Sequence, residues 1–189
     1  MNLKKVIFLD RDGTINRDSP DYIKCWEEFE FLPGSLEALA RLTRDDCSLI
    51  LITNQSAIGR AMVDLQTLEH THSRLRATVA AAHGRIDDIF YCPHRPDEGC
   101  ACRKPKPGLI RQACERHGID PADSIMIGDS AKDILCGRNA GCAMTILVRT
   151  GNGREAEKVL AERHQSPDAV AADLMHAAEI IESHFKHAV

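Results

Sequence analysis

Short apolar segments alternate along this chain with longer stretches of helical periodicity, and this alternation limits the folds open to it. The apolar segments predict buried strands at residues 6–9, 49–52, 89–91, 125–127 and 145–148. Helical spacing predicts helices at residues 35–44, 64–83, 108–117, 132–139, 154–164 and 173–185. This order indicates an α/β fold, a doubly wound parallel sheet with right-handed crossovers, in which ligands bind beyond the carboxyl ends of the strands.

Size and charge narrow the class of protein further. The 189 residues, 43% hydrophobic, suit one core, so we expect residues 1–189 to form a single domain. A net charge of -4 argues against sequence-independent binding of nucleic acid or of an anionic membrane. Without a signal peptide or an apolar run of about 20 residues, a cytoplasmic protein is expected. No heptad pattern demands a partner, so a monomer is expected.

Residues 8–15 carry the strongest functional signal. Here a predicted strand ends in two carboxylates, Asp10 and Asp12, followed by a Gly-Thr turn. Such close like charges repel unless a cation lies between them, and their oxygen ligands suit Mg²⁺. One carboxylate can then attack a phosphoryl group while the other, with a raised pKa, donates a proton to the leaving oxygen. A solvated Asp-x-Asp turn is the alternative for this segment alone.

Three further segments favour a phosphate site. The Thr53 hydroxyl, at the end of the second predicted strand, can hold a phosphoryl oxygen. Arg103 and Lys104 place two cations on a proline-stiffened loop before a helix, where with Thr53 they would stabilise transition-state charge. Asp129 ends the fourth predicted strand as a further acid for the metal, and Asp133 is spaced to orient Lys104 through an ion pair. Taken singly, these segments also fit an ordinary strand-end cap or a solvated basic loop.

Together and in this order, these elements resemble the haloacid-dehalogenase-like phosphatases over nearly the whole chain. The resemblance implies that Asp10 is the nucleophile and Asp12 the general acid and base. It also implies that Thr53 binds phosphate, that Lys104 neutralises charge, and that Asp129 holds Mg²⁺ with the Asp10 side chain and the Asp12 backbone carbonyl. We therefore expect a magnesium-dependent phosphomonoesterase that works through a phospho-aspartate.

One loop gathers three of the 8 cysteines and a histidine, namely Cys92, His94, Cys100 and Cys102. Three thiolates and an imidazole form a closed set that suits tetrahedral structural Zn²⁺. Because Cys102 directly precedes the basic pair, folding of the metal site would also aim the phosphate-binding cations. A redox-active pair and free thiols are the alternatives. The other cysteines lack ligand spacing and are predicted to be packed thiols: Cys25, Cys47, Cys114, Cys136 and Cys142.

The spacing of the motifs leaves room for only a minimal cap over the site. Residues 13–52 must hold a predicted helix and strand, and the next segment holds one helix, one strand and the Cys-His loop. With its minimal cap, this chain resembles the D-glycero-D-manno-heptose 1,7-bisphosphate 7-phosphatase family. The motifs that carry the resemblance are Asp-Arg-Asp-Gly-Thr-Ile-Asn, Thr-Asn-Gln-Ser, Cys-Pro-His, Cys-x-Cys-Arg-Lys-Pro and Val-Arg-Thr-Gly. That resemblance implies removal of the 7-phosphate in nucleotide-activated heptose biosynthesis, on a route to lipopolysaccharide or other heptose glycans.

The same resemblance implies substrate contacts from Asp18, Ser19, Asp21, Asn54 and Arg103, besides those from the phosphate-binding residues above. The loop carries an additional residue around Ser19-Pro20 relative to the family pattern. Exposed acidic turn residues are the alternative for Asp18 and Asp21. The two histidines at positions 70 and 72 lie on one predicted helix and face differently, so both are expected at the surface.

Rival functions remain open. Histidinol-phosphate phosphatases share the loop motifs and the zinc set, but they are often fused to a dehydratase, and no such extension is present in this chain. A polynucleotide 3'-phosphatase shares the acidic loop, yet a net charge of -4 fits nucleic acid poorly. A non-catalytic, zinc-stabilised interaction module would be expected to lose one of Asp10, Asp12, Lys104 or Asp129, and this chain keeps all of them.

Overall fold

The protein, described by a computed structural model at residues 5–44 and 46–187, is built on one parallel sheet. Its strands are β1 (Lys5–Leu9), β2 (Cys47–Asn54), β3 (Asp88–Cys92), β4 (Ser124–Gly128), β5 (Met144–Val148) and β6 (Ala169–Ala171). They are hydrogen-bonded in the order β3-β2-β1-β4-β5-β6, and every pair is parallel. Each predicted strand is confirmed. The additional β6 was missed because its Ala-Val-Ala sequence is too short to give an apolar run.

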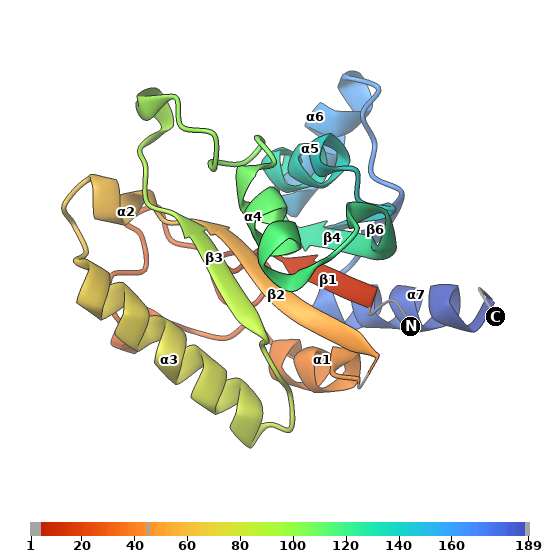
Figure 1. Cartoon of the computed structure of the whole chain (residues 1–189), viewed down its shortest axis with the longest axis horizontal. Coiled ribbons are helices and arrows are strands. Elements are labelled where there is room, and N and C mark those ends of the chain that lie inside the picture. The colour runs from red at the N-terminus through yellow and green to blue at the C-terminus, as the bar shows by residue number, and fades with distance from the viewer. Residues whose placement is uncertain (1–4, 45, 188–189) are drawn as a thin grey trace.

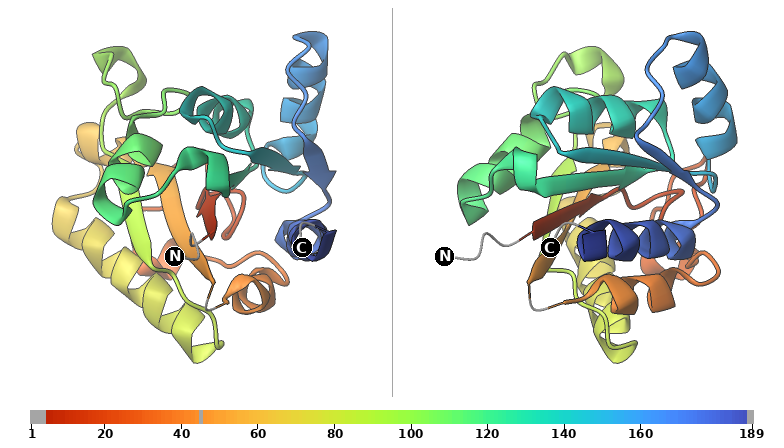
Figure 2. Two further views of the ribbon diagram at one scale, coloured as in Figure 1. Left: turned by 45° about the vertical axis from the view of Figure 1, so that its right-hand side comes forward. Right: turned by 90° about the vertical axis from the view of Figure 1, so that its right-hand side faces the viewer.

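Helices cover both faces of this sheet (Figures 1 and 2). The α-helices are α1 (Ser35–Leu42), α2 (Ser56–Gly59), α3 (Leu65–Ala81), α4 (Gly108–His117), α5 (Ala131–Ala140), α6 (Gly153–Glu162) and α7 (Leu174–His187). Short 3-10 turns are η1 (Trp26–Glu28), η2 (Pro96–Glu98) and η3 (Pro121–Asp123). The predicted helices are present, α4 with its predicted bounds. The short α2 was not predicted.

The two faces of β1 show why the strands are continuously apolar. Ile7 and Leu9 belong to the core under α1, α3 and α7, whereas Val6 and Phe8 pack under α4 and α5. All four side chains are at most 2% exposed. Because helices cover both faces, neither set of alternating residues can be polar, as in other doubly wound parallel sheets.

The order of the strands determines which residues meet. β1 lies between β2 and β4, so the carboxyl ends of these three strands share one edge of the sheet. Between β1 and α1 the chain forms a loop anchored by stacked Trp26 and Phe29 rings, whose centroids are 5.2 Å apart. Between β2 and β3 it forms only α2 and α3. The predicted minimal cap is therefore confirmed.

Among the residues that the structure describes, no helix has the length and apolar character needed to span a membrane.

Candidate active site

A pocket of about 310 Å³ opens where β1, β2 and β4 end. Asp10 directly follows β1, Thr53 is the penultimate residue of β2, and Asp129 directly follows β4. The pocket lining includes most of the predicted site: Asp10, Asp12, Asp18, Ser19, Thr53, Asn54, Arg103, Lys104, Asp129 and Asp133. The sheet thus brings together residues that are far apart in sequence.

A buried cation lies at the centre of this pocket. The Nζ of Lys104 is 2.9 Å from Oδ1 of Asp10 and 2.6 Å from Oδ1 of Asp133, and it donates to the Ile52 carbonyl at 2.8 Å. Burial lowers the pKa of Lys104, but the two carboxylates outweigh burial and raise it above its usual value. The predicted ion pair between Lys104 and Asp133 is present, and Lys104 is held charged beside Asp10.

The ion pair is supported by the start of α5. Both the backbone N–H and the hydroxyl of Ser130 donate to Oδ2 of Asp133, at 3.0 and 2.7 Å. Asp133 thus caps the helix and contacts Lys104 with its other oxygen. The helix N-terminus therefore fixes the carboxylate that positions the lysine.

Three carboxylates, those of the partly buried Asp10 and the buried Asp129 and Asp133, have oxygens that lie within 4.8 Å of one another. Burial and the Asp133 carboxylate raise the pKa of Asp10, against the opposing effect of Lys104. Burial and Asp133 likewise raise the pKa of Asp129 to about 7. One lysine does not balance the three acids, and hard oxygen donors at this spacing fit a divalent cation such as Mg²⁺.

The side chain of Asp12 lies outside this cluster. Its Oδ1 accepts from Asn16 at 2.8 Å, its Oδ2 accepts from Gln55 at 2.9 Å, and the Arg11 guanidinium contacts both oxygens at 3.0 Å. Burial would raise the pKa of Asp12, but Arg11, Asn16 and Gln55 together lower it. The expected raised pKa of Asp12 is therefore wrong for the free protein, because a buried guanidinium and two amides stabilise the ionised form.

Hydrogen bonds hold the remaining phosphate-site candidates in place. The buried Thr53 hydroxyl accepts from Gln55 Nε2 at 2.9 Å. Asn54 Oδ1 accepts from the Lys104 backbone N–H at 3.1 Å, so this amide ties the end of β2 to the basic loop. Arg103 donates to the His94 carbonyl at 3.2 Å and links the pocket to the Cys-His loop.

The loop after β1 is brought to the pocket only in part. Asp18 and Ser19 line it, and Oδ2 of Asp18 accepts from Asn152 Nδ2 at 3.1 Å. Asp21, in contrast, is exposed and does not line the pocket. Its backbone N–H donates to the Ser19 hydroxyl, so Asp21 takes part in the turn. The alternative of an exposed acidic turn residue therefore fits Asp21 better than a substrate contact.

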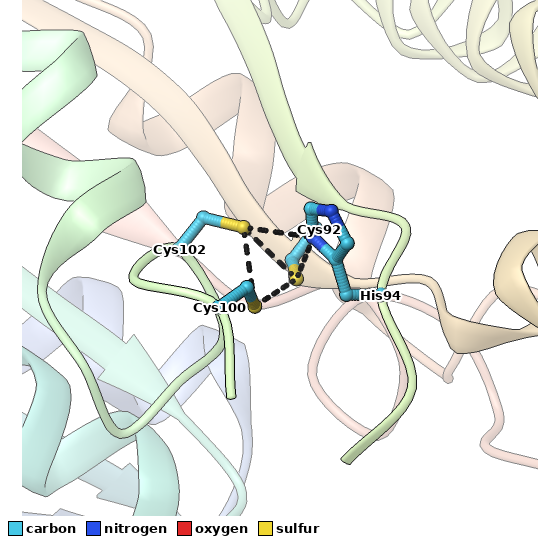
Figure 3. Close-up of side chains that lie close together, drawn as sticks. All are labelled: Cys92, His94, Cys100 and Cys102. Carbon is cyan, nitrogen blue, oxygen red and sulfur yellow. Dashed lines mark hydrogen bonds between the residues drawn. The ribbon is translucent and has the colours of Figure 1, made fainter. Parts of the chain in front are cut away.

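Cys92, His94, Cys100 and Cys102 lie together beside the pocket, with their sulfur and nitrogen atoms turned toward a common centre (Figure 3). The Cys102 sulfur is 3.2 Å from the Cys92 sulfur and 3.5 Å from the Cys100 sulfur, and His94 Nδ1 is 3.3 Å from Cys102. These separations are much longer than the ~2.05 Å of a disulfide. They approach the edge of about 3.8 Å expected around a zinc ion with Zn–S bonds of about 2.3 Å.

Several residues that line the pocket or lie behind it were not predicted as site residues, although most of them stand inside the motifs already noted. Arg11 separates the two catalytic candidates, Gln55 follows Asn54, and Asn152 lies between Gly151 and Gly153 in the turn after β5. The Asn152 backbone N–H donates to Asp129 Oδ2 at 2.8 Å. The expected surface position of His72 is wrong, because this residue is buried and contacts Arg11.

The arrangement of acids, hydroxyl and lysine at adjacent strand ends defines the class of protein, the haloacid-dehalogenase-like phosphatases. Residues 101–177 match a family model described as HAD-hydrolase-like. A Bordetella bronchiseptica protein named D-glycero-beta-D-manno-heptose-1,7-bisphosphate 7-phosphatase is 47% identical over 151 residues, which cover 80% of this chain and 84% of that protein. This chain belongs to the D-glycero-beta-D-manno-heptose-1,7-bisphosphate 7-phosphatase family.

Two further comparisons extend over more of the chain. A Pseudomonas putida protein with the same name is 46% identical over 169 residues, covering 89% of this chain and 96% of that one. The crystal structure of D,D-heptose 1,7-bisphosphate phosphatase from B. bronchiseptica, complexed with magnesium and phosphate, matches with a TM-score of 0.87 and 42% identity. It covers 95% of this chain and 99% of that chain.

Proposed function

We propose that this protein is a magnesium-dependent phosphomonoesterase that removes the 7-phosphate of D-glycero-beta-D-manno-heptose 1,7-bisphosphate. The observation that carries this proposal is the contact between Lys104 and Asp10 in a pocket at the strand ends, in a chain 47% identical to a protein of that name. The product, a heptose 1-phosphate, suits nucleotide activation on a route to lipopolysaccharide or other heptose glycans. We further propose that the enzyme acts as a cytoplasmic monomer and binds no nucleic acid.

The first chemical step transfers the phosphoryl group to Asp10. An oxygen of Asp10 bonds to phosphorus as the bond to the sugar oxygen breaks, and Asp12 gives a proton to that oxygen. Because the pKa of Asp12 is lowered in the free protein, Asp12 is ionised before substrate binds. It receives the proton that it later donates from the phosphomonoester, whose second ionisation lies near pH 6. Lys104, Thr53 and Arg103 stabilise the charge on the transferring group.

The second step releases phosphate. Asp12, ionised again, takes a proton from water as the water oxygen bonds to phosphorus, and the bond from phosphorus to Asp10 breaks. This restores the Asp10 carboxylate, and Asp12 becomes a carboxylate again when its proton leaves with the released phosphate. The lowered pKa of Asp12 suits this base role directly.

The Mg²⁺ proposal is supported by the buried oxygen donors of Asp10 and Asp129, completed by the Asp12 backbone carbonyl. Their raised pKa values reflect repulsion and burial that a cation would relieve. A bound Mg²⁺ would supply neutralisation of the phosphoryl oxygens. The structural neighbour complexed with magnesium and phosphate supports the same assignment.

We also propose a structural Zn²⁺ held by Cys92, His94, Cys100 and Cys102. A closed set of soft ligands fits this ion and leaves no open position for catalysis. Arg103, next to the last ligand, bonds back to the His94 carbonyl, so the metal loop orients a cation that faces the pocket.

The deciding experiment measures Mg²⁺-dependent phosphate release from the beta and alpha anomers of heptose 1,7-bisphosphate, from histidinol phosphate and from a 3'-phosphorylated oligonucleotide. We expect one phosphate per bisphosphate and the highest kcat/KM with the beta anomer. A preference for histidinol phosphate would overturn the sugar substrate but keep the mechanism. If the wild-type protein hydrolyses no phosphoester, the enzymatic proposal fails, and the non-catalytic interaction module becomes the better explanation.

A further inference from the structure

A buried arginine lies behind the proposed acid and base. Arg11 is 1% exposed, and its Nε and Nη2 form a fork on the Asp12 carboxylate at 3.0 to 3.1 Å. The guanidinium also lies 5.7 Å from the centroid of the Phe29 ring. Asp12 itself is 21% exposed toward the pocket. Its orientation in the pocket therefore depends on how firmly this guanidinium is held.

Two acceptors fix the rest of the guanidinium. Nη2 donates to Gln55 Oε1 at 3.1 Å, and Nη1 lies 3.3 Å from His72 Nε2. A buried cation whose donors lack partners is costly, so both acceptors are needed to keep Arg11 in this position. Gln55 follows β2, whereas His72 comes from α3, which otherwise lies apart from the pocket lining.

His72 is suited to accept and not to donate at Nε2. It is 7% exposed, and burial followed by the Arg11 charge lowers its pKa to about 3, so the ring is neutral near pH 7. Its ring also packs near Tyr91, with centroids 5.8 Å apart. The ring is thus fixed between β3 and the guanidinium.

We propose that His72 is a positioning residue, which holds Arg11 so that the Asp12 carboxylate stays aimed at the water that attacks the phospho-aspartate. This inference rests on the proposed function, because it presupposes that Asp12 is the base for that step. His72 itself touches neither substrate nor the reacting atoms. Its influence passes through Arg11, so it should change the rate of the water step more than substrate capture.

The test compares two substitutions of similar size. His72→Phe keeps the ring volume without an acceptor, whereas His72→Gln places an amide oxygen near the former position of Nε2. With p-nitrophenyl phosphate, whose leaving group needs no proton, His72→Phe should lower kcat at least about tenfold and leave kcat/KM within about threefold of wild type. Its reaction should begin with a burst of p-nitrophenolate, because the phospho-aspartate accumulates. His72→Gln should recover most of kcat.

Two controls separate positioning from a general structural effect. His70→Phe, on the exposed side of the same helix, should leave both parameters unchanged. Arg11→Lys keeps the charge but cannot form the fork, so it should give the same burst and loss of kcat even if His72→Phe fails to fold.

Equal losses of kcat and kcat/KM without a burst, or a His72→Gln variant as slow as His72→Phe, would overturn the role of His72. Unchanged kinetics in His72→Phe would overturn it as well. These outcomes presuppose an active wild-type enzyme. They are therefore distinct from failure of the proposed function, in which wild type itself releases no phosphate.

Discussion

Asp129 should make the Mg²⁺-free protein less stable as the pH rises. Its pKa is raised from 3.8 to about 7 by burial and by the Asp133 carboxylate. Between these values the folded protein keeps a proton that the unfolded chain has released, so the free energy of unfolding falls with increasing pH. At about 1.4 kcal/mol per pH unit, the total loss is about 4 kcal/mol, complete above pH 7. About 2 kcal/mol of it falls between pH 5.5 and 8.

The assay is urea unfolding at pH values from 5.5 to 8, in buffer without Mg²⁺ and without a chelator, so that the Cys-His loop keeps any tightly bound metal. Residue 129 cannot titrate in Asp129→Asn. The free energy of unfolding of this variant should therefore fall by about 2 kcal/mol less than that of wild type over this pH range. The exposed substitution Asp97→Asn serves as the matched control and should run parallel to wild type. Because Asp10 shifts in the same direction, wild type should fall by at least this amount.

Adding Mg²⁺ provides the second half of the experiment. Ionised carboxylates are the ligands, so Mg²⁺ should stabilise wild type more at pH 8 than at pH 5.5 and should stabilise Asp129→Asn much less. The same pH dependence in wild type and Asp129→Asn would refute the reasoning, because the titrating group would then lie elsewhere.

Three other substitutions test separate parts of the site. Asp10→Asn should abolish phosphate release while leaving the circular dichroism spectrum unchanged, and substantial residual turnover would remove the phospho-aspartyl proposal. Metal analysis should find close to one zinc per chain in wild type and a large loss in Cys100→Ser; a folded wild-type protein without zinc would contradict the structural site. Gly151→Ala would bring a Cβ within 2.1 Å of Asp129 Oδ2 and should weaken Mg²⁺ binding at least about tenfold by titration. Gly118→Ala has a similar positive φ but open space around the Cβ, so it should leave Mg²⁺ binding unchanged.

Strand ends were the most predictable part of the site. Asp10, Thr53 and Asp129 each follow or close a buried apolar run, and a parallel sheet brings such ends to one edge whatever the details of packing. The ion pair between Lys104 and Asp133 was also predicted, from the position of Asp133 one helical turn after Asp129. The Cys-His site was likewise visible in the sequence, because three of the 8 cysteines and a histidine fall within eleven residues.

The features of the site that were not predicted depend on the directions in which side chains point. The pKa of Asp12 is lowered because Arg11 folds back on it, and adjacent residues in an irregular loop give no sign of that contact. His72 did leave a signal, since positions 68, 72, 75 and 79 follow helical spacing on the buried face of α3. His72 was nevertheless expected at the surface, because it was considered with His70 and not with the apolar positions of this face. Its partner Arg11, 61 residues away in sequence, could not be recognised from helical spacing.

The central place of β1 has a consequence for biosynthesis. This strand is made early, yet its second neighbour, β4, begins only at Ser124. Until β4 leaves the ribosome, one edge of β1 has unpaired backbone groups beside apolar side chains, a template for pairing with other chains. Nascent chains that stop before β4 should therefore aggregate or engage chaperones, and longer ones that include β4 should do so much less.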